Sequence, residues 1–359
     1  MNQEKFLFPN NQVISHSSFW EAPSNIALIK YWGKKGNQIP SNPSISFLLS
    51  KCFTRTKIKF SPINSEKDPW FTFKLNGKIK LDFYKKIEIF LDRILPYMPS
   101  LKNHNLIINS SNSFPHSSGI ASSASSMAAM ALCITDWERQ INIKMTEEMF
   151  KMKSSFLARL GSGSASRSIY GPISSWGKTS HLKESSDIYA VPLKQKVHKI
   201  FDGFCNSIII IDEAEKEISS TEGHRLMNEH PFAKKRFHKA NQNFLEIKNS
   251  LLTGDIQKFI QIVESEALTL HALMMTSSPS YKLFKPETIK IIELIKNYRE
   301  NSKNPLCFTL DAGPNIHLLY PKAYRKDVLD FIDNELIKTF PSIKFIHDQV
   351  GNGPKKIYF

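Results

Sequence analysis

The stretch PHSSGIASSA, residues 115–124, joins a short apolar run to a segment with helical periodicity. The apolar run NLIIN, residues 105–109, is bounded by turn-forming residues and predicts a buried strand. A loop is expected over residues 110–118. From Ala121, apolar residues spaced three or four apart predict a helix with one apolar face that continues to about Trp137. This part of the chain therefore predicts a strand, a loop of small residues and a helix.

The composition of this loop suits a phosphate-binding site. Small residues let backbone N–H groups converge on an anion, the start of the helix contributes its dipole, and serine hydroxyls donate hydrogen bonds or bind magnesium. No Gly-Lys-Ser/Thr sequence ends the loop, which excludes a Walker A motif. A Ser/Ala-rich helix start packed tightly against a neighbour would have the same composition, so the loop alone leaves both interpretations open.

A second loop of the same kind follows the next predicted helix. Thr146 is a candidate N-cap for that helix, and Gly161 ends it. The loop, residues 161–168, reads GSGSASRS, and the planar fork of Arg167 suits two oxygens of a phosphate. A flexible Gly/Ser linker is the alternative interpretation. Two anion-binding loops would indicate two phosphorylated ligands.

Two further segments carry candidate binding or catalytic residues. Residues 22–35, APSNIALIKYWGKK, place amphipathic aromatic side chains between lysines, which suits an anionic ligand. A strand edge whose lysines extend into solvent would look the same. Asp311 follows a predicted strand and precedes Gly-Pro, so its carboxylate is expected at a rigid strand end, although most Asp residues in such a position only form the turn.

The remainder of the chain also alternates between helical and strand patterns. Further elements are expected at residues 207–211 (strand), 231–252, 255–271 and 286–298 (helices), and 306–310 and 316–320 (strands). Both halves mix the two kinds of element, so the predicted fold class is α+β. With 359 residues and 41% apolar content, the chain exceeds one ordinary hydrophobic core, and we expect two domains at residues 1–200 and 201–359.

The chain is basic, with 48 Lys and Arg against 33 Asp and Glu and a formal charge of +15. Such a surplus favours anionic partners, which include nucleic acid, an acidic membrane surface and phosphorylated small molecules; a Lys-rich solvated surface is the alternative. The tightest basic cluster has a spacing that fits one exposed helix; its members are Lys234, Lys235, Arg236 and Lys239.

The cysteines and the hydropathy of the chain indicate in which cellular compartment the protein is expected. The four cysteines are far apart, lack the short spacing of a zinc or redox motif, and lie beside apolar residues, which predicts four buried free thiols in a reducing compartment. Residues 103–135 contain no charged side chain, but Asn and Ser interrupt them, so no membrane span is predicted. The apolar stretch near the amino terminus is too short for a signal peptide. We therefore expect a cytoplasmic protein without a membrane partner.

Taken together, the segments resemble the diphosphomevalonate decarboxylase family of the GHMP kinase superfamily. The motifs that carry the resemblance occur in the order of the family and span residues 22–315; they are Asn25-Ile26-Ala27-x-x-Lys30-Tyr31-Trp32-Gly33-Lys34, Gly119-x-Ala121-Ser122-Ser123-Ala124, Gly161-Ser162-Gly163-Ser164-Ala165-x-Arg167-Ser168, Ser219-Ser220-Thr221-x-Gly223 and Asp311-Ala312-Gly313-Pro314-Asn315. The resemblance implies an amino-terminal half like ribosomal protein S5 domain 2, a ferredoxin-like carboxyl-terminal half, an active site between them, and a homodimer.

The resemblance also implies a reaction. Mevalonate 5-diphosphate and ATP would give isopentenyl diphosphate, carbon dioxide, ADP and phosphate, with magnesium. Phosphorylation of the tertiary 3-hydroxyl makes a leaving group, and its departure draws electrons from the carboxylate as carbon dioxide leaves. No nucleic-acid partner is expected.

The family pattern assigns roles residue by residue. Asp311 would orient or deprotonate the 3-hydroxyl, Lys30 would support the ionised Asp311 and developing phosphate charge, and Arg167 would hold the substrate carboxylate. The residues expected to contact the substrate are Asn25, Tyr31, Trp32, Gly33, Lys34, Ser162, Gly163, Ser164, Ala165, Ser166 and Thr221. Those expected to contact ATP are Ser117, Ser118, Gly119, Ala121, Ser122 and Ser123. Magnesium would be held mainly by the ATP phosphates, with Ser122 or Ser123 as a candidate ligand.

One departure from the family pattern and two rival functions remain. The family more often has Thr-Ala-Ala where residues 116–118 read His-Ser-Ser, which leaves the contacts of the ATP loop open. A mevalonate or phosphomevalonate kinase of the same fold is the nearest rival, but such kinases generally carry a Gly-rich motif where this chain has Asp-Ala-Gly-Pro-Asn at 311–315. An RNA-binding protein is a more distant rival, supported by the charge but lacking a basic patch interleaved with aromatic residues.

Overall fold

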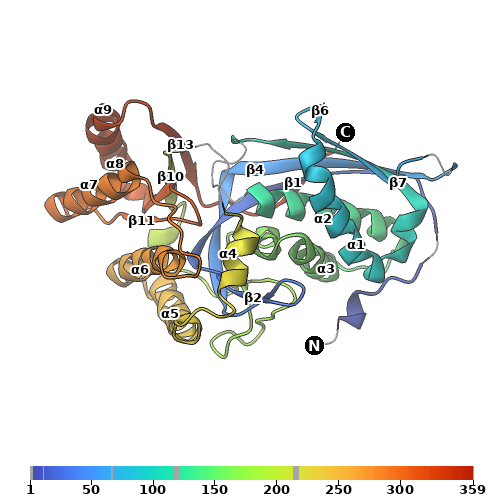
Figure 1. Ribbon diagram of the computed structural model, residues 1–359, viewed down its shortest axis with the longest axis horizontal. Coiled ribbons are helices and arrows are strands. Elements are labelled where there is room, and N and C mark those ends of the chain that lie inside the picture. Colours follow the sequence, from blue (N-terminus) through green and yellow to red (C-terminus); the bar gives the residue numbers. More distant parts are fainter. Residues whose placement is uncertain (1–2, 11, 66–67, 116–121, 213–217, 359) are drawn as a thin grey trace.

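The computed structural model describes residues 3–10, 12–65, 68–115, 122–212 and 218–358. Two sheet-centred halves lie side by side (Figure 1). The first half contains β1 (His16–Ile29), β2 (Lys34–Lys35), β3 (Ile39–Pro40), β4 (Ser44–Pro62), β5 (Phe71–Leu75), β6 (Lys78–Ile79), α1 (Tyr84–Ile94), β7 (His104–Asn112), α2 (Ser122–Ile141), α3 (Glu147–Gly161), the 3₁₀ helix η5 (Gly163–Ile169), β8 (Ile173–Trp176) and β9 (Val191–Pro192). The second contains β10 (Cys205–Ile210), α4 (Ser220–Leu226), α5 (Ala233–Thr253), α6 (Ile256–Met275), α7 (Pro286–Ser302), β11 (Cys307–Thr309), β12 (Ile316–Tyr320), α8 (Arg325–Phe331), α9 (Ile337–Thr339) and β13 (Lys344–Gln349); β14 (Lys355–Lys356) follows.

The first sheet is built on two long antiparallel strands, β1 and β4. Within the described residues the strand order is β14-β1-β4-β7-β5-β6, and β8 pairs with β4 and β9. Side chains of β4 alternate between buried and more exposed from Cys52 to Phe60, as expected for a sheet with one covered face. The helices α1, α2 and α3 cover that face (Figure 1).

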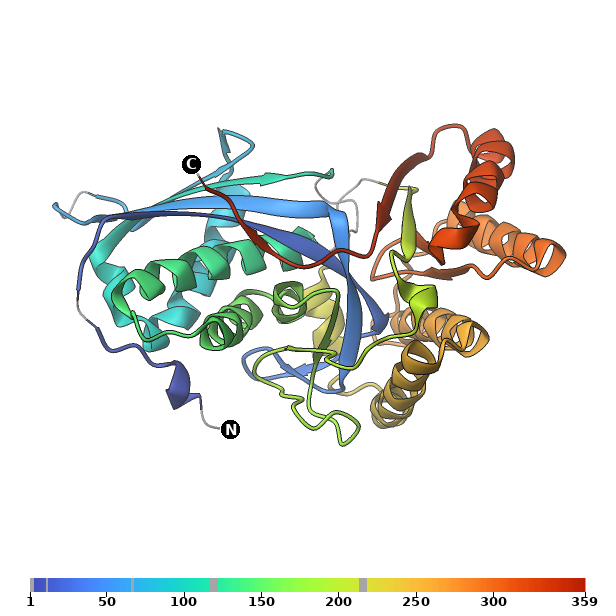
Figure 2. The ribbon, with the colours of Figure 1, turned by 180° about the vertical axis from the view of Figure 1, so that it is seen from behind.

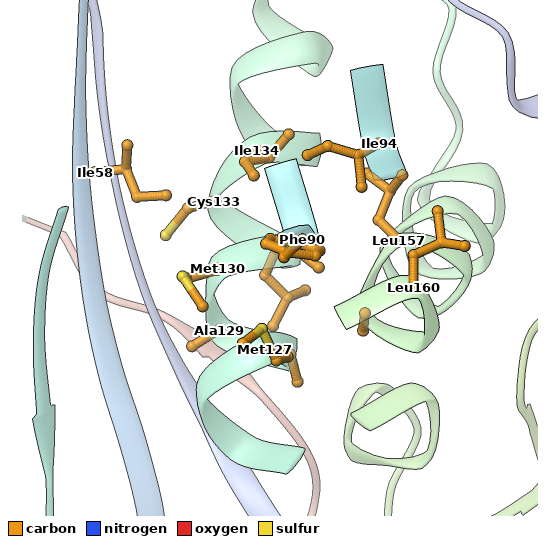
Figure 3. Packing of buried hydrophobic residues seen from close by; sticks show 14 of the residues in the cluster. Ile58, Phe90, Ile94, Met127, Ala129, Met130, Cys133, Ile134, Leu157 and Leu160 are labelled. Carbon is orange, nitrogen blue, oxygen red and sulfur yellow. The ribbon is translucent and has the colours of Figure 1, made fainter. Parts of the chain in front are cut away.

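Helix α2 is the centre of the first core. It lies between the sheet and the helices α1 and α3, where Met130 and Cys133 lie toward the strands and Phe90 and Leu157 come from the neighbouring helices (Figure 3). Fourteen of its 20 residues are buried. The prediction of one apolar face was therefore too narrow, because α2 is covered on both sides, and its many Ala residues let the neighbours approach closely.

The strand predicted before α2 is confirmed as β7, but it continues to Asn112 where a loop was expected to start at residue 110. The polar residues of the extension are satisfied by cross-strand hydrogen bonds. The Thr56 and Ser110 hydroxyls lie 2.9 Å apart, and the Thr54 hydroxyl donates to Asn112 Oδ1 at 2.8 Å. Polar residues therefore continue the ladder without leaving a buried group unpaired.

The second sheet has the order β11-β12-β10-β13, and every pair in it is antiparallel. Numbered along the chain, this is the strand order 2-3-1-4, which reads 4-1-3-2 from the other edge and has the ferredoxin-like arrangement. The chain then returns to the first half, where β14 pairs with β1 (Figure 2). One apolar cluster also contains Ile26 and Phe47 from the first half and Ile208 and Phe244 from the second. The two halves therefore share packed core.

Several expectations from composition can be compared with the structure. All four cysteines are free and buried, as predicted. The prediction that the basic cluster lies on one exposed helix was only partly right. Lys234, Lys235 and Lys239 on α5 are exposed, whereas Arg236 is buried and bonded to Glu266. In the described part of the chain, no helix has the length and hydropathy to cross a bilayer.

Candidate active site

An ion pair joins the two halves of the molecule. Lys30 follows the last residue of β1, and Asp311 lies two residues beyond β11. The Lys30 Nζ donates to Asp311 Oδ1 at 2.9 Å, across 281 positions of sequence. The Lys30 side chain is 2% exposed, and the Asp311 side chain is 29% exposed. The carboxylate is thus the accessible member of the pair, with the ammonium group behind it.

Arg167 brings a second buried cation to this carboxylate. Burial lowers the pKa of Arg167 to about 10, and the charge of Asp311 opposes that shift. Burial likewise lowers the pKa of Lys30, and the hydrogen bond and charge of Asp311 oppose it. One accessible carboxylate is therefore set against two cations in a place of low solvation, where charge interactions are strong.

The segment that carries Arg167 is a 3₁₀ helix, η5, and not the open loop that its Gly/Ser content predicted. Local hydrogen bonds explain the difference, because Ser166 Oγ donates to the Gly163 carbonyl at 2.8 Å and Ala165 N–H donates to the Ser162 carbonyl. Ala165 and Ser166 are fully buried in this helix, so they support the fold of the segment and do not line its surface.

Asn25 and Ser44 fix the orientation of Arg167. The Arg167 Nε donates to Asn25 Oδ1 at 3.2 Å, and Nη1 donates to the Ser44 hydroxyl at 2.6 Å. Asn25 in turn donates to Ser168 Oγ at 2.9 Å and to the Ser164 carbonyl. The Nη2 group of Arg167 carries two further N–H donors, so a guanidinium held in this way keeps capacity for a ligand oxygen.

The aromatic residues after Lys30 pack against η5. A Cβ at Gly163 would lie 2.7 Å from the Trp176 ring and 2.9 Å from the Tyr31 hydroxyl, so only glycine allows this approach. Among the described residues, the buried Tyr31 hydroxyl has no hydrogen-bond partner. A buried hydroxyl without a partner is costly, which makes Tyr31 a candidate donor to a bound ligand.

His224, which the sequence analysis did not identify, organises the same segment. Its ring lies 4.3 Å from the Tyr31 ring and 4.6 Å from the Trp32 ring, and its Nδ1 accepts the N–H of Gly33 at 2.9 Å. Burial lowers the pKa of His224 to about 3, so the imidazole is neutral at physiological pH. His224 and the exposed Thr221 both lie on α4, which brings the Ser-Ser-Thr motif beside Tyr31 and Trp32.

A further basic group that the sequence did not reveal lies near Lys34. Burial lowers the pKa of Lys34, and the charge of Arg93 on α1 lowers it further. The Arg93 Nη1 also donates to the Leu160 carbonyl at 2.9 Å, close to the start of η5. The like charges of Lys34 and Arg93 repel each other, and an anion bound beside them would relieve that repulsion. No local motif surrounds Arg93 in the sequence, so only tertiary packing identifies it.

The remaining predicted residues divide into two groups. Ser162 and Ser164 are half-buried, and their hydroxyls lie 3.4 Å apart beside Gly163. At the start of α2, Ser122 is half-buried and Ser123 is exposed. The other predicted contacts to ATP lie outside the described residues; they are Ser117, Ser118, Gly119 and Ala121.

Comparison with known families agrees with this arrangement. The model of the diphosphomevalonate decarboxylase-like N-terminal domain matches residues 22–190, and that of the mevalonate 5-diphosphate decarboxylase C-terminal domain matches residues 207–356. The chain belongs to the diphosphomevalonate decarboxylase family. The diphosphomevalonate decarboxylase of Candida albicans is 30% identical over 332 residues, which cover 88% of each chain.

Solved structures of decarboxylases share the whole fold. The mevalonate diphosphate decarboxylase of Staphylococcus aureus matches with a TM-score of 0.81 and 30% identity, over 96% of this chain and 99% of its own. The decarboxylase MDDEF, solved in complex with MVAPP, AMPPCP and magnesium, matches with a TM-score of 0.82 and 27% identity, over 96% of this chain and all of its own. The expected two-domain α+β fold of the GHMP kinase type is thereby confirmed.

Proposed function

We propose that Asp311, Lys30 and Arg167 carry out the ATP-dependent decarboxylation of mevalonate 5-diphosphate, which is the activity of the decarboxylase family to which the chain belongs. The products are isopentenyl diphosphate, carbon dioxide, ADP and phosphate. The observation that carries the assignment of roles is the 2.9 Å contact between the buried Lys30 ammonium and the accessible Asp311 carboxylate.

Asp311 is proposed to act on the 3-hydroxyl of the substrate. An accessible carboxylate that accepts a hydrogen bond from lysine on one side can accept the hydroxyl proton on the other, as the hydroxyl oxygen attacks the γ-phosphate. Lys30 keeps the carboxylate ionised and lies close to the charge that develops on the transferring phosphoryl group. The departing phosphate then leaves positive charge at C3, which draws electrons from the substrate carboxylate as carbon dioxide is released.

Arg167 is proposed to hold that substrate carboxylate until it leaves. Its guanidinium is oriented by Asn25 and Ser44, and its Nη2 donors suit a planar carboxylate. The diphosphate and chain of the substrate are assigned to the residues around Tyr31 and η5, with Arg93 and His224 as additions from the structure. Six of the eleven residues that the sequence analysis expects at the substrate are assigned to this task; they are Tyr31, Trp32, Lys34, Ser162, Ser164 and Thr221.

ATP and magnesium are the co-substrate and metal of the reaction. The residues present fit a metal carried by ATP, because the accessible carboxylate of Asp311 is already paired with Lys30. The hydroxyl of Ser122 or Ser123 at the start of α2 would contribute a further ligand, and the loop before α2 would hold the ATP phosphates. When bound, magnesium neutralises charge on the phosphates during transfer.

A substrate comparison tests this function. The purified protein is incubated with ATP, magnesium and either mevalonate, its 5-phosphate or its 5-diphosphate, and both ADP and carbon dioxide are measured. Equal amounts of ADP and carbon dioxide from the diphosphate alone are expected. ADP without carbon dioxide would assign the chain to the kinases of the same fold, and no ADP from any substrate would contradict both assignments.

We propose further that the enzyme is a cytoplasmic homodimer with domains at residues 1–200 and 201–359. The four buried free thiols support a reducing compartment. The resemblance to a family of homodimers supports the dimer, and the boundary after residue 200 falls between the two ranges matched by the family models. Light scattering at several protein concentrations would test the dimer, and a monomer at all concentrations would contradict it.

A further inference from the structure

The main chain of Lys30, in the first half, is held by side chains of the second half. The Lys30 N–H donates to Glu266 Oε2 at 2.9 Å. The Lys30 carbonyl accepts from Arg236 Nη2 at 3.0 Å, and also from Asn42 Nδ2 at 3.0 Å. Glu266 lies on α6 and Arg236 lies on α5. Both polar groups of one peptide segment are thus bonded by a pair of helices from the other half.

Glu266 and Arg236 also bond to each other. Arg236 donates two hydrogen bonds of 2.7 Å to the two carboxylate oxygens of Glu266, and Asn243 adds a third at 2.6 Å. The Glu266 side chain is fully buried, and the Arg236 side chain is 1% exposed. A buried ion pair gives little net stability compared with apolar residues of similar volume, so its position against Lys30 calls for another explanation.

The same helix contacts the other member of the catalytic pair. His271 on α6 donates from Nε2 to the Asp311 carbonyl at 3.1 Å, and its ring stacks on Phe284 at 4.0 Å. One rigid helix therefore bonds the main chain of Lys30 through Glu266 and the main chain of Asp311 through His271. Its two contacts fix the spacing between the residues whose side chains form the ion pair.

We propose that Glu266, held by Arg236, is a positioning residue that sets Lys30 against Asp311, and that His271 does the same for Asp311 from the same helix. This inference rests on the roles proposed above for Lys30 and Asp311. Neither Glu266 nor His271 is assigned a contact with substrate. Their effect is exerted through the placement of the two catalytic side chains, where displacements of about 1 Å cost up to roughly a hundredfold in rate.

The charges around Lys30 give this role a measurable signature. The groups that face it are Asp311 after β11, Glu266 on α6, Arg236 on α5, Arg167 on η5 and His317 on β12. Burial lowers the pKa of Lys30, and the charge of Glu266 is one of the interactions that oppose this shift. Replacing Glu266 by a neutral residue therefore lowers the pKa of Lys30 further, and the lysine loses its proton at lower pH.

The test compares Glu266→Gln with the matched control Glu138→Gln. Glu138 forms a buried ion pair with Lys153 at 2.5 Å between α2 and α3, away from the site. Glu266→Gln is expected to lower kcat by roughly ten- to a hundredfold with a much smaller change in KM for the diphosphate substrate. It should also move the alkaline limb of the pH profile of kcat to lower pH. Glu138→Gln should lower the melting temperature and leave kcat and the pH profile unchanged.

A second variant keeps the proposal testable if Glu266→Gln does not fold. His271→Phe preserves the ring stacked on Phe284 but removes the donor to Asp311; it should lower kcat without moving the alkaline limb, because the carboxylate of Glu266 that faces Lys30 is kept. Unchanged kcat in His271→Phe, or a Glu266→Gln variant whose only defect is a lower melting temperature, would overturn the inference. A parent protein that releases no carbon dioxide would instead contradict the proposed function.

Discussion

Two buried Lys–carboxylate pairs in this molecule have the same chemistry and opposite surroundings. In the Lys153–Glu138 pair the side chains are 6% and 2% exposed, and burial lowers the pKa of Lys153 and raises that of Glu138. In the Lys30–Asp311 pair the lysine is equally buried, but the carboxylate is 29% exposed. In the first pair both charged groups are buried, whereas in the second pair the carboxylate is accessible to an incoming molecule. Accessibility of one partner therefore separates the pair that we propose to be catalytic from the structural one.

The two pairs also differ in what brings them together. Lys153 and Glu138 lie 15 positions apart on the neighbouring helices α2 and α3. Lys30 and Asp311 lie 281 positions apart, at the ends of strands in different sheets. A local pair forms as its helices pack, but the Lys30–Asp311 pair exists only when both halves of the molecule are folded and docked. The site is thus a property of the contact between the halves.

The largest effect is expected from removing the accessible carboxylate. Asp311→Asn should lower kcat by about a hundred- to ten-thousandfold, because the amide cannot accept the hydroxyl proton. ATP binding, measured by titration calorimetry, should remain close to that of the parent, since no phosphate contact is lost. If Asp311→Asn turned over normally, the distinction between the two pairs would have no functional meaning.

A smaller loss is expected when the second cation of the site is changed but its charge is kept. Arg167→Lys should lower kcat/KM by roughly ten- to a hundredfold, because an ammonium group cannot reproduce the oriented bonds to Asn25, Ser44 and a ligand carboxylate. Steady-state kinetics with the diphosphate substrate measure this change. Parent-like kinetics would mean that Arg167 serves the packing of η5 only.

A purely structural charge should affect stability and not turnover. Burial opposes ionisation of Asp136, but the His16 ring 3.6 Å away and hydrogen bonds from Lys356 and Ser18 prevail and lower its pKa to about 2. A depressed carboxyl pKa stabilises the fold above the ordinary value of 3.8, and the contribution is lost as the pH falls from about 4 to about 2. Asp136→Asn should therefore cost about 2 kcal/mol at pH 7 with kcat unchanged.

Urea unfolding of the parent and of Asp136→Asn at several pH values would check this prediction. The difference in the free energy of unfolding should be constant above pH 5 and should shrink below pH 4. A difference that does not vary with pH would show that the ionised form of Asp136 is not what stabilises the contact between α2 and the strands β1 and β14.

The smallest effect is expected at the start of α3, where one hydrogen bond caps the helix. The Thr146 hydroxyl accepts the N–H of Met149 at 3.2 Å at the start of α3. Thr146→Ala should lower the free energy of unfolding by about 1 kcal/mol, because one N–H of the first turn loses its partner. Thermal unfolding and kcat of this variant would be measured together, and a loss of activity at a temperature where it is fully folded would contradict the expectation.

Local patterns in the sequence predicted much of the fold. The Thr146 cap, the end of α3 at Gly161 and the strand Ile316–Tyr320 all follow from signals within a few residues. The long strand β1 was not identified, because most of its residues are buried and its sequence shows little alternation; β4 was not identified either, although its side chains alternate from Cys52 to Phe60. The 3₁₀ helix η5 was also missed, since its structure depends on tertiary packing that overrides the flexibility of Gly and Ser.

Site residues that belong to a sequence motif were predicted, and those placed only by tertiary packing were missed. Family resemblance identified Lys30, Arg167 and Asp311, and the structure places their charges close together. His224 directly follows the Ser219-Ser220-Thr221-x-Gly223 motif and Glu266 lies in a predicted helix, but neither belongs to a motif itself, and their contacts span 191 and 236 positions. A sequence pattern does not report contacts at such separations, so residues that support the catalytic pair become visible only in the folded molecule.

The central claim is that Lys30 and Asp311 act as one unit, and a double-mutant cycle on kcat tests it most directly. Lys30→Met, Asp311→Asn and the double variant would be compared with the parent in the assay of ADP and carbon dioxide. Because each residue depends on the other, the double variant should be little slower than the slower single variant. Losses that multiply, so that the double variant shows the product of the two single effects, would contradict the account.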